Sequence, residues 1–95
     1  MIQVVAPLWL STGETASWHC VTVPKELSDE IRAHGLVRRG GFGSVRVEVT
    51  IGEVSWRTSV FPQKSGGYLL PVKADVRRRA DIAAGDEVSL TLELL

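Results

Sequence analysis

Cysteine and histidine are scarce in this sequence. The chain has 95 residues, of which one is cysteine, Cys20, and two are histidine, His19 and His34. A single thiol cannot form an intrachain disulfide, and no CxxC pair or Cys/His cluster is present for zinc. No Ser-His-Asp or HExxH spacing surrounds either histidine. We therefore expect no metal and no cofactor, and we rank binding above catalysis while leaving an enzyme open.

Long hydrophobic runs and a net charge are also lacking. No apolar run approaches the roughly 20 residues that span a bilayer. The opening stretch MIQVVAPLWLSTG carries no basic residue before its apolar part, unlike a secretory signal. With the lone thiol, these features predict a cytoplasmic protein without a membrane partner. The 11 basic and 11 acidic side chains cancel, which weighs mildly against a protein that coats nucleic acid.

Alternating apolar and polar residues are abundant, and they predict strands. Apolar Val45, Val47 and Val49 alternate with charged or polar neighbours, the pattern of a half-buried strand. Gly52-Glu53 follows, and a glycine in first place is typical of a type II′ hairpin turn. The return strand is expected to end at Val60. Further strands are predicted over residues 2–10, 16–23, 68–70 and 88–94.

Two short helices are predicted between these strands. Pro24 can open the first helix, because a first-turn residue needs no amide donor. Gly35 is expected to end that helix, and residues 37–43 then form a flexible basic loop. The second helix is expected over residues 73–80. With 44% hydrophobic residues, the chain can build one core as a single domain over residues 1–95.

The order of elements occurs twice along the chain. Each half has a strand, a proline corner, a helix, a glycine-containing loop and an alternating strand, with Pro24 and Pro71 at matching corners. Two such halves facing each other could close a barrel, although chance similarity is the alternative interpretation. We expect a mainly β barrel with two short helices. If the halves do not close on each other, a swapped dimer replaces the monomer, so both a monomer and a homodimer stay open.

Three runs carry a resemblance that covers most of the chain. They are WHCVTVPKELSDEI, GFGSVRVEVTIGEVSWRTSVFP and GGYLLPVKADVRRRADIAAGDEVSLTLEL. Together they resemble the family known as domain of unknown function nineteen-oh-five, and the block WRTSVFP…LPVKADVR is the most specific part. The resemblance implies a closed double-split β-barrel of two pseudo-repeated halves. The family has no established activity to carry over.

A second resemblance covers the C-terminal run LLPVKADVRRRADIAAGDEVSLTLEL. It is similar to the half-barrel unit of the AbrB and MazE regulators, in which two short chains interlock into one barrel that can bind DNA. The spacing from Pro71 to Gly85 is longer here, and the first half lacks the Gly-Asp turn. The resemblance implies a nucleic-acid-binding regulator as an alternative function.

Arginines supply the candidate nucleic-acid site. The residues are Arg38, Arg39, Arg77, Arg78 and Arg79. Arginine forms bidentate hydrogen bonds with phosphate oxygens and releases counterions when it does so. The alternative is a solvated helix face, on which Asp75 and Arg79 have the spacing of an ion pair.

A second candidate site is a small-ligand pocket at a barrel end. It would be formed by Trp9, Arg57, Ser59, Tyr68 and Lys73. A few polar groups that converge on an aromatic wall are typical of such pockets. Trp9 is included because it lies opposite the apolar face of its strand.

The other tryptophans and the cysteine are assigned to packing. Trp18 and Trp56 share strand faces with apolar neighbours, so both are expected in the core. Cys20 alternates with Trp18, which makes a thiol nucleophile an unattractive interpretation. The leading function is therefore a non-catalytic binding or interaction module, with a protein or nucleic acid as partner. A small-molecule-binding protein or enzyme with a barrel-end pocket is the second alternative.

Overall fold

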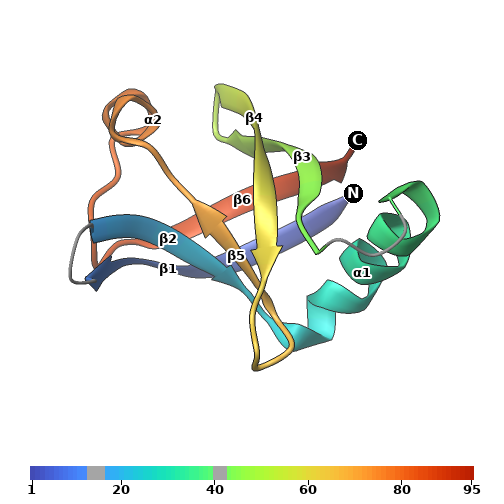
Figure 1. The fold of residues 1–95 in the computed structure, drawn as a ribbon. Helices are drawn as coiled ribbons and strands as arrows, with labels where there is room; N and C mark the ends of the chain where they lie inside the picture. Colours follow the sequence, from blue (N-terminus) through green and yellow to red (C-terminus); the bar gives the residue numbers. More distant parts are fainter. Residues whose placement is uncertain (13–16, 40–42) are drawn as a thin grey trace.

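The computed structural model describes residues 1–12, 17–39 and 43–95, with the backbone alone for 37–39. Six strands and two helices follow one another along the chain (Figure 1). They are β1 (Ile2–Thr12), β2 (Ser17–Val23), α1 (Lys25–Arg39), β3 (Val45–Ile51), β4 (Val54–Pro62), β5 (Tyr68–Pro71), α2 (Ala74–Ala80) and β6 (Glu87–Leu94). Residues 13–15, which lie between the first two predicted strands, and residues 40–42 of the predicted basic loop lie outside the described residues.

The six strands form a closed barrel in the order β1-β2-β5-β4-β3-β6, and every pair of neighbours is antiparallel. This order is unchanged when β1, β2 and β3 are exchanged with β4, β5 and β6. α1 links β2 to β3, and α2 links β5 to β6, so the helices also correspond. The prediction of a mainly β closed barrel with two related halves is confirmed.

The core lies inside the barrel and follows the alternation of the strands. In β1, Ile2, Val4, Ala6 and Leu8 are buried while the residues between them are exposed or half-buried, as the pleat of a strand requires. Leu10 continues the same face but is 45% exposed, so the predicted buried face is shorter than expected. Helix side chains close the core, which contains Ile2, Val4, Ala6, Leu8, Val21, Val23, Ile31, Val45, Val47, Val49, Val60, Tyr68, Leu70, Val72, Val76, Val88, Leu90 and Leu92.

The hairpin of β3 and β4 forms as predicted. Val45 lies opposite Val60 and Ile51 lies opposite Val54, with a two-residue turn between the strands. Gly52 has φ 59°, which a type II′ turn needs at its first central position and which glycine adopts without steric cost. The turn therefore fixes the register of the whole hairpin.

The predicted end of the first helix is wrong. α1 continues past Gly35 to Arg39, so residues 37–39 belong to the helix and not to a loop. A Cβ placed on Gly35 would lie 2.9 Å from Cγ2 of Val45 in β3. Glycine is present here because the helix approaches the sheet closely, and the missing side chain makes room for Val45.

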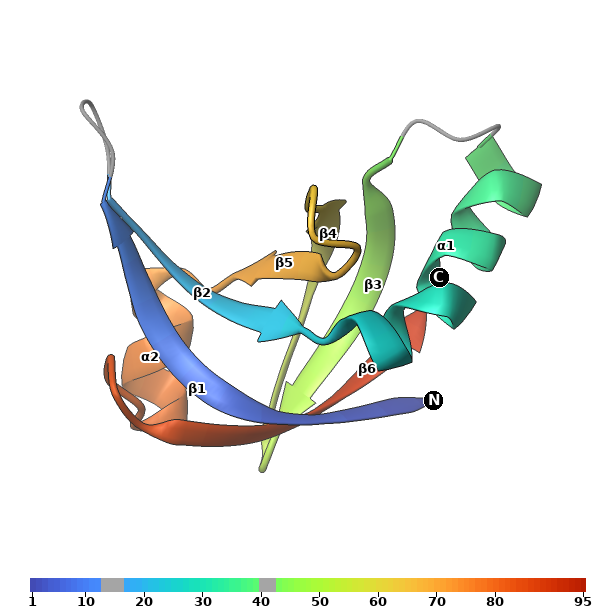
Figure 2. The ribbon, with the colours of Figure 1, turned by 90° about the horizontal axis from the view of Figure 1, so that it is seen from below.

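The barrel is split at two corresponding places. β1 pairs with β6 over Ile2–Pro7 and then with β2 over Leu8–Thr12. β4 likewise pairs with β3 over Val54–Val60 but with β5 only through Phe61 and Pro62. Among the residues that the structure describes, one edge of β1 and one edge of β4 are therefore left without a strand partner over most of their length. α1 lies beside the first split and α2 beside the second, at opposite ends of the barrel (Figures 1 and 2).

Candidate functional site

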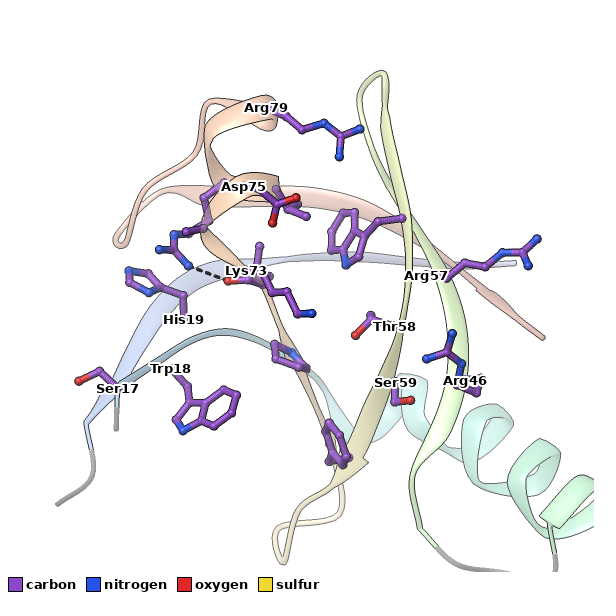
Figure 3. A pocket seen from close by; sticks show the side chains of 17 residues that line it. Ser17, Trp18, His19, Arg46, Arg57, Thr58, Ser59, Lys73, Asp75 and Arg79 are labelled. Atoms are coloured by element: carbon purple, nitrogen blue, oxygen red, sulfur yellow. Dashed lines mark hydrogen bonds between the residues drawn. The ribbon is translucent and has the colours of Figure 1, made fainter. Parts of the chain in front are cut away.

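A cleft of about 720 Å³ lies between β4 and α2, at the second split of the barrel. Its walls are residues 56–59 of β4 on one side and residues 71–77 and 79, which include most of α2, on the other. The beginning of β2 contributes Ser17, Trp18 and His19 (Figure 3). α2 has seven residues and α1 has fifteen, so at a rise of 1.5 Å per residue α2 is about half as long as α1.

Basic side chains dominate the charge of this cleft. Arg46, Arg57, Lys73, Arg77 and Arg79 line it, together with a single acid, Asp75. Because the whole chain has no net charge, this local excess is matched by acids elsewhere. Part of the balance is at the other split, where Glu26, Asp29 and Glu30 of α1 line a hollow beside the start of β1. The two corresponding splits therefore carry charges of opposite sign.

Two of the five basic side chains already have partners. The Arg57 Nε donates to Glu48 Oε1 at 3.1 Å, and Arg57 points away from the cleft along the outside of β4 (Figure 3). Nη1 of Arg77 donates to the Val72 carbonyl at 2.7 Å and so ties α2 to the strand end before it.

The other three are available to a ligand. Within the described parts of the chain, Arg46, Lys73 and Arg79 form no ion pair. Lys73 and Arg79 extend from the α2 side toward β4 (Figure 3).

Exposed aromatic rings flank the cleft. Trp18 is 59% exposed and Phe61 is 46% exposed. The expectation that Trp18 packs in the core is therefore wrong. Trp18 does share a strand face with buried Cys20, but that face points out of the barrel and is covered only near Cys20. Trp56 is half-buried and packs against the core, and it also lines the cleft.

A smaller apolar hollow continues the cleft. It has a volume of about 270 Å³, and its lining residues include Ser11, Cys20 and Leu69. The two cavities share Trp18, Phe61 and Pro71. Burial raises the pKa of the Cys20 thiol, because the buried site disfavours the thiolate. The hollow is therefore an uncharged extension of a positively charged cleft.

The structure brings together three of the five residues predicted for a ligand pocket. Arg57, Ser59 and Lys73 all line the cleft. Trp9 instead donates from Nε1 to Thr22 Oγ1 at 2.9 Å and is half-buried. Tyr68 is buried in the core, with the guanidinium of Arg32 over its ring at 5.6 Å from the centroid.

The five arginines that were predicted to form a nucleic-acid site do not lie together in the structure. Arg77 and Arg79 line the cleft, although Arg77 is engaged with the Val72 carbonyl, and Arg78 lines a separate hollow. The side chains of Arg38 and Arg39 lie outside the described part of the structure. Their backbone ends α1, which is at the opposite end of the barrel from α2 (Figure 2).

Several cleft residues were not predicted from the sequence. Arg46 could have been found, because the hairpin register that the sequence predicts places it opposite Ser59. No comparable signal exists for Trp18 and Phe61. Their exposure depends on what covers β2 and β4, and those covering segments come from distant parts of the sequence.

Outside the cleft, the described acids and histidines give no sign of a metal site. In the described ranges, no three His, Cys, Asp or Glu side chains are grouped so that they could hold a metal ion. His34 forms a hydrogen bond from Nε2 to the Leu95 carbonyl at 2.7 Å. None of the helices that the structure describes is long and apolar enough to cross a membrane.

Comparison with known proteins identifies a family. No curated protein matches the chain. The model of a family described as a domain of unknown function (DUF1905) matches residues 5–92, which is almost the whole barrel. By this match, the chain belongs to the DUF1905 family.

Proposed function

We propose that this protein is a non-catalytic binding module, and that it holds an anionic ligand in the cleft between β4 and α2. One observation carries the proposal: in a chain without net charge, a single cleft beside exposed aromatic rings is lined by five basic residues. Three of them, Arg46, Lys73 and Arg79, form no ion pair with the described residues. A cleft of about 720 Å³ is within the range of small-ligand sites.

The chemistry of the lining residues defines the ligand. Guanidinium and ammonium groups form charge-assisted hydrogen bonds with carboxylates and phosphates. A concave surface of one charge also concentrates counter-ions of the opposite sign. Trp18, Phe61 and Pro71 add apolar surface at the edge of the cleft. The favoured ligand therefore combines negative charge with an apolar or ring-shaped group.

The test compares two variants with equal loss of charge. Lys73→Ala/Arg79→Ala removes two cations that line the cleft, and Lys64→Ala/Arg78→Ala removes two exposed cations that do not. Tryptophan fluorescence would follow the binding of hexaglutamate and of hexathymidylate at low salt. Each exposed charge that contacts the ligand contributes up to about 1 kcal/mol to the binding free energy. The first variant should therefore bind about tenfold more weakly than the parent, whereas the second should bind within about twofold of it.

Two results would reject this proposal. One is that neither probe binds to the parent protein even at low salt. The other is that both double variants lose affinity equally, since binding would then reflect the overall charge of the surface and not the cleft. Turnover of a substrate that is lost with the cleft variant would instead establish the enzyme alternative.

Single-stranded nucleic acid is a second candidate ligand, favoured by the exposure of Trp18 and Phe61. Bases stack on aromatic side chains with about 1–3 kcal/mol for each base, and nearby cations follow the phosphates. Fluorescence anisotropy with single-stranded and duplex oligonucleotides at low and near-physiological salt tests this candidate. Binding that falls steeply with salt, and that weakens in Arg77→Ala/Arg78→Ala/Arg79→Ala, would support a regulator of the AbrB and MazE type.

A further inference from the structure

We infer that the ligand of this cleft is an extended acidic peptide segment of a partner protein, which adds as a strand to the free edge of β4. This inference rests on the proposed function of the same cleft and names its class of ligand. The proposed function was argued from charged and aromatic side chains, whereas this inference is argued from the backbone groups of β4.

The edge of β4 faces the cleft without a strand partner. β4 pairs with β3 along Val54–Val60, whereas β5 reaches only Phe61 and Pro62 on the other edge. Residues 56–59 of β4 line the cleft. In the part of the chain that the structure describes, no other strand neighbours β4.

The register shows which backbone groups point to this free edge. The Arg46 carbonyl accepts a hydrogen bond from the Leu95 amide at 3.2 Å, on the β6 side of β3. The backbone groups of Arg46 thus point away from β4. In an antiparallel pair, the residue opposite, Ser59, then points its own backbone groups away from β3. The same holds for every second residue, so Arg57 and Ser55 also present an N–H and a C=O to the free edge.

A peptide backbone complements such an edge better than other anions do. It offers donors and acceptors in alternation and lies about 4.8 Å from its neighbour in a sheet. Strand addition to an exposed edge is a recurring mode of peptide recognition. A nucleic acid backbone offers acceptors at its phosphates but no matching row of donors. The edge therefore favours a peptide over an oligonucleotide.

The side chains around the edge define the sequence of the peptide. Arg46, Lys73 and Arg79 favour Asp and Glu. The apolar hollow beside Trp18 and Phe61 favours a large apolar side chain at one end of the segment. We expect acidic residues to alternate with apolar ones, since alternate side chains of a strand face opposite sides.

The first experiment compares two peptides that differ only in their backbone. One is an acetylated hexapeptide in which Glu alternates with Val, and the other is the same peptide with alternate amides N-methylated. Methylation keeps the charge and removes the donors, each of which contributes about 0.5–1.5 kcal/mol. We expect the methylated peptide to bind at least about tenfold more weakly. Equal binding of both peptides overturns the strand inference but leaves the proposed function standing, whereas no binding of any anion overturns both.

Amide hydrogen exchange gives a readout at the individual residues of β4. On addition of the unmodified peptide, exchange at Ser55, Arg57 and Ser59 should slow by about tenfold or more, because these amides gain a partner. The amides of Trp56 and Thr58 already face β3 and serve as internal controls. Unchanged exchange at the three edge amides in a saturated complex overturns the inference.

A pair of substitutions at one position completes the test. Ser59→Pro removes an N–H that has no ladder partner, which an edge strand tolerates, and Ser59→Ala keeps it. The proline variant should bind the peptide about fivefold more weakly, with the alanine variant within about twofold of the parent. Hexathymidylate that binds more tightly than the peptide and displaces it from the cleft would assign the site to nucleic acid and overturn the peptide inference.

Discussion

Because α1 lies close to β3, we expect the effect of Gly35→Ala on stability to change sign when Val45 is also replaced. In Gly35→Ala, the new Cβ would lie 2.9 Å from Cγ2 of Val45, a β-branched side chain that is 4% exposed. Insertion of a methyl group into a packed core costs about 1–3 kcal/mol. Alanine in place of glycine inside a helix gains about 1 kcal/mol. We therefore expect Gly35→Ala to lower the free energy of unfolding by about 1 kcal/mol.

The Val45→Ala background removes the obstructing Cγ2. This substitution alone destabilises the protein, because it removes buried methyl groups. When Gly35→Ala is added to it, the clash is gone and the gain in helix propensity remains, so the double variant should be about 1 kcal/mol more stable than Val45→Ala. The coupling energy between the two positions is then about 2 kcal/mol, within the range for residues in contact.

Urea denaturation of the parent, both single variants and the double variant measures this cycle directly. A change of 1 kcal/mol also corresponds to a shift of about 4–8 °C in Tm for a domain of this size. If Gly35→Ala stabilises both backgrounds equally, then α1 does not approach β3 as described, and Gly35 is only a weak helix position. If it destabilises both equally, the cost does not come from Val45.

Three further predictions concern the sites described above. Burial raises the pKa of Cys20, so the folded state favours the neutral thiol. The free energy of unfolding should therefore fall as pH rises beyond about 9. The variant Cys20→Ser should lack that part of the pH dependence. Trp18→Ala should cost less than about 1 kcal/mol of stability because the ring is 59% exposed, whereas Leu8→Ala in the core should cost about 2–5 kcal/mol in the same denaturation assay. Trp9→Phe removes the hydrogen bond from Nε1 to Thr22 and should lower stability by about 1 kcal/mol, and an unchanged melting curve would contradict that assignment.

The local elements of the barrel could be predicted from the sequence because their signals are local. Alternation from Val45 to Val49 predicted a strand, and the glycine at position 52 predicted the turn type and with it the register of the hairpin. A register places side chains opposite each other and on a common face. It therefore contains enough information to place Arg57 and Ser59 in one region of the surface.

Whether other segments cover the outer face of a strand depends on the tertiary structure, and the sequence did not predict it. Trp18 and Cys20 share a face of β2, yet one is exposed and the other buried. The neighbours of Cys20 in the sheet, Trp9 and Pro71, come from other strands, and Pro71 is far away in the sequence. Gly35 likewise has the local signature of a helix end, and only the proximity of Val45 gives it another role.

The cleft itself is the clearest example of this division. The sequence by itself determined the strands, the two helices, the repeated order of elements and the neutral charge. Only the tertiary structure decided that β4 parts from β5 after two residue pairs and that a short α2 leaves the split partly uncovered. The physical reason is that strand alternation specifies which side of a strand is apolar, whereas the pairing of its edges and the covering of its faces depend on segments far away in the sequence.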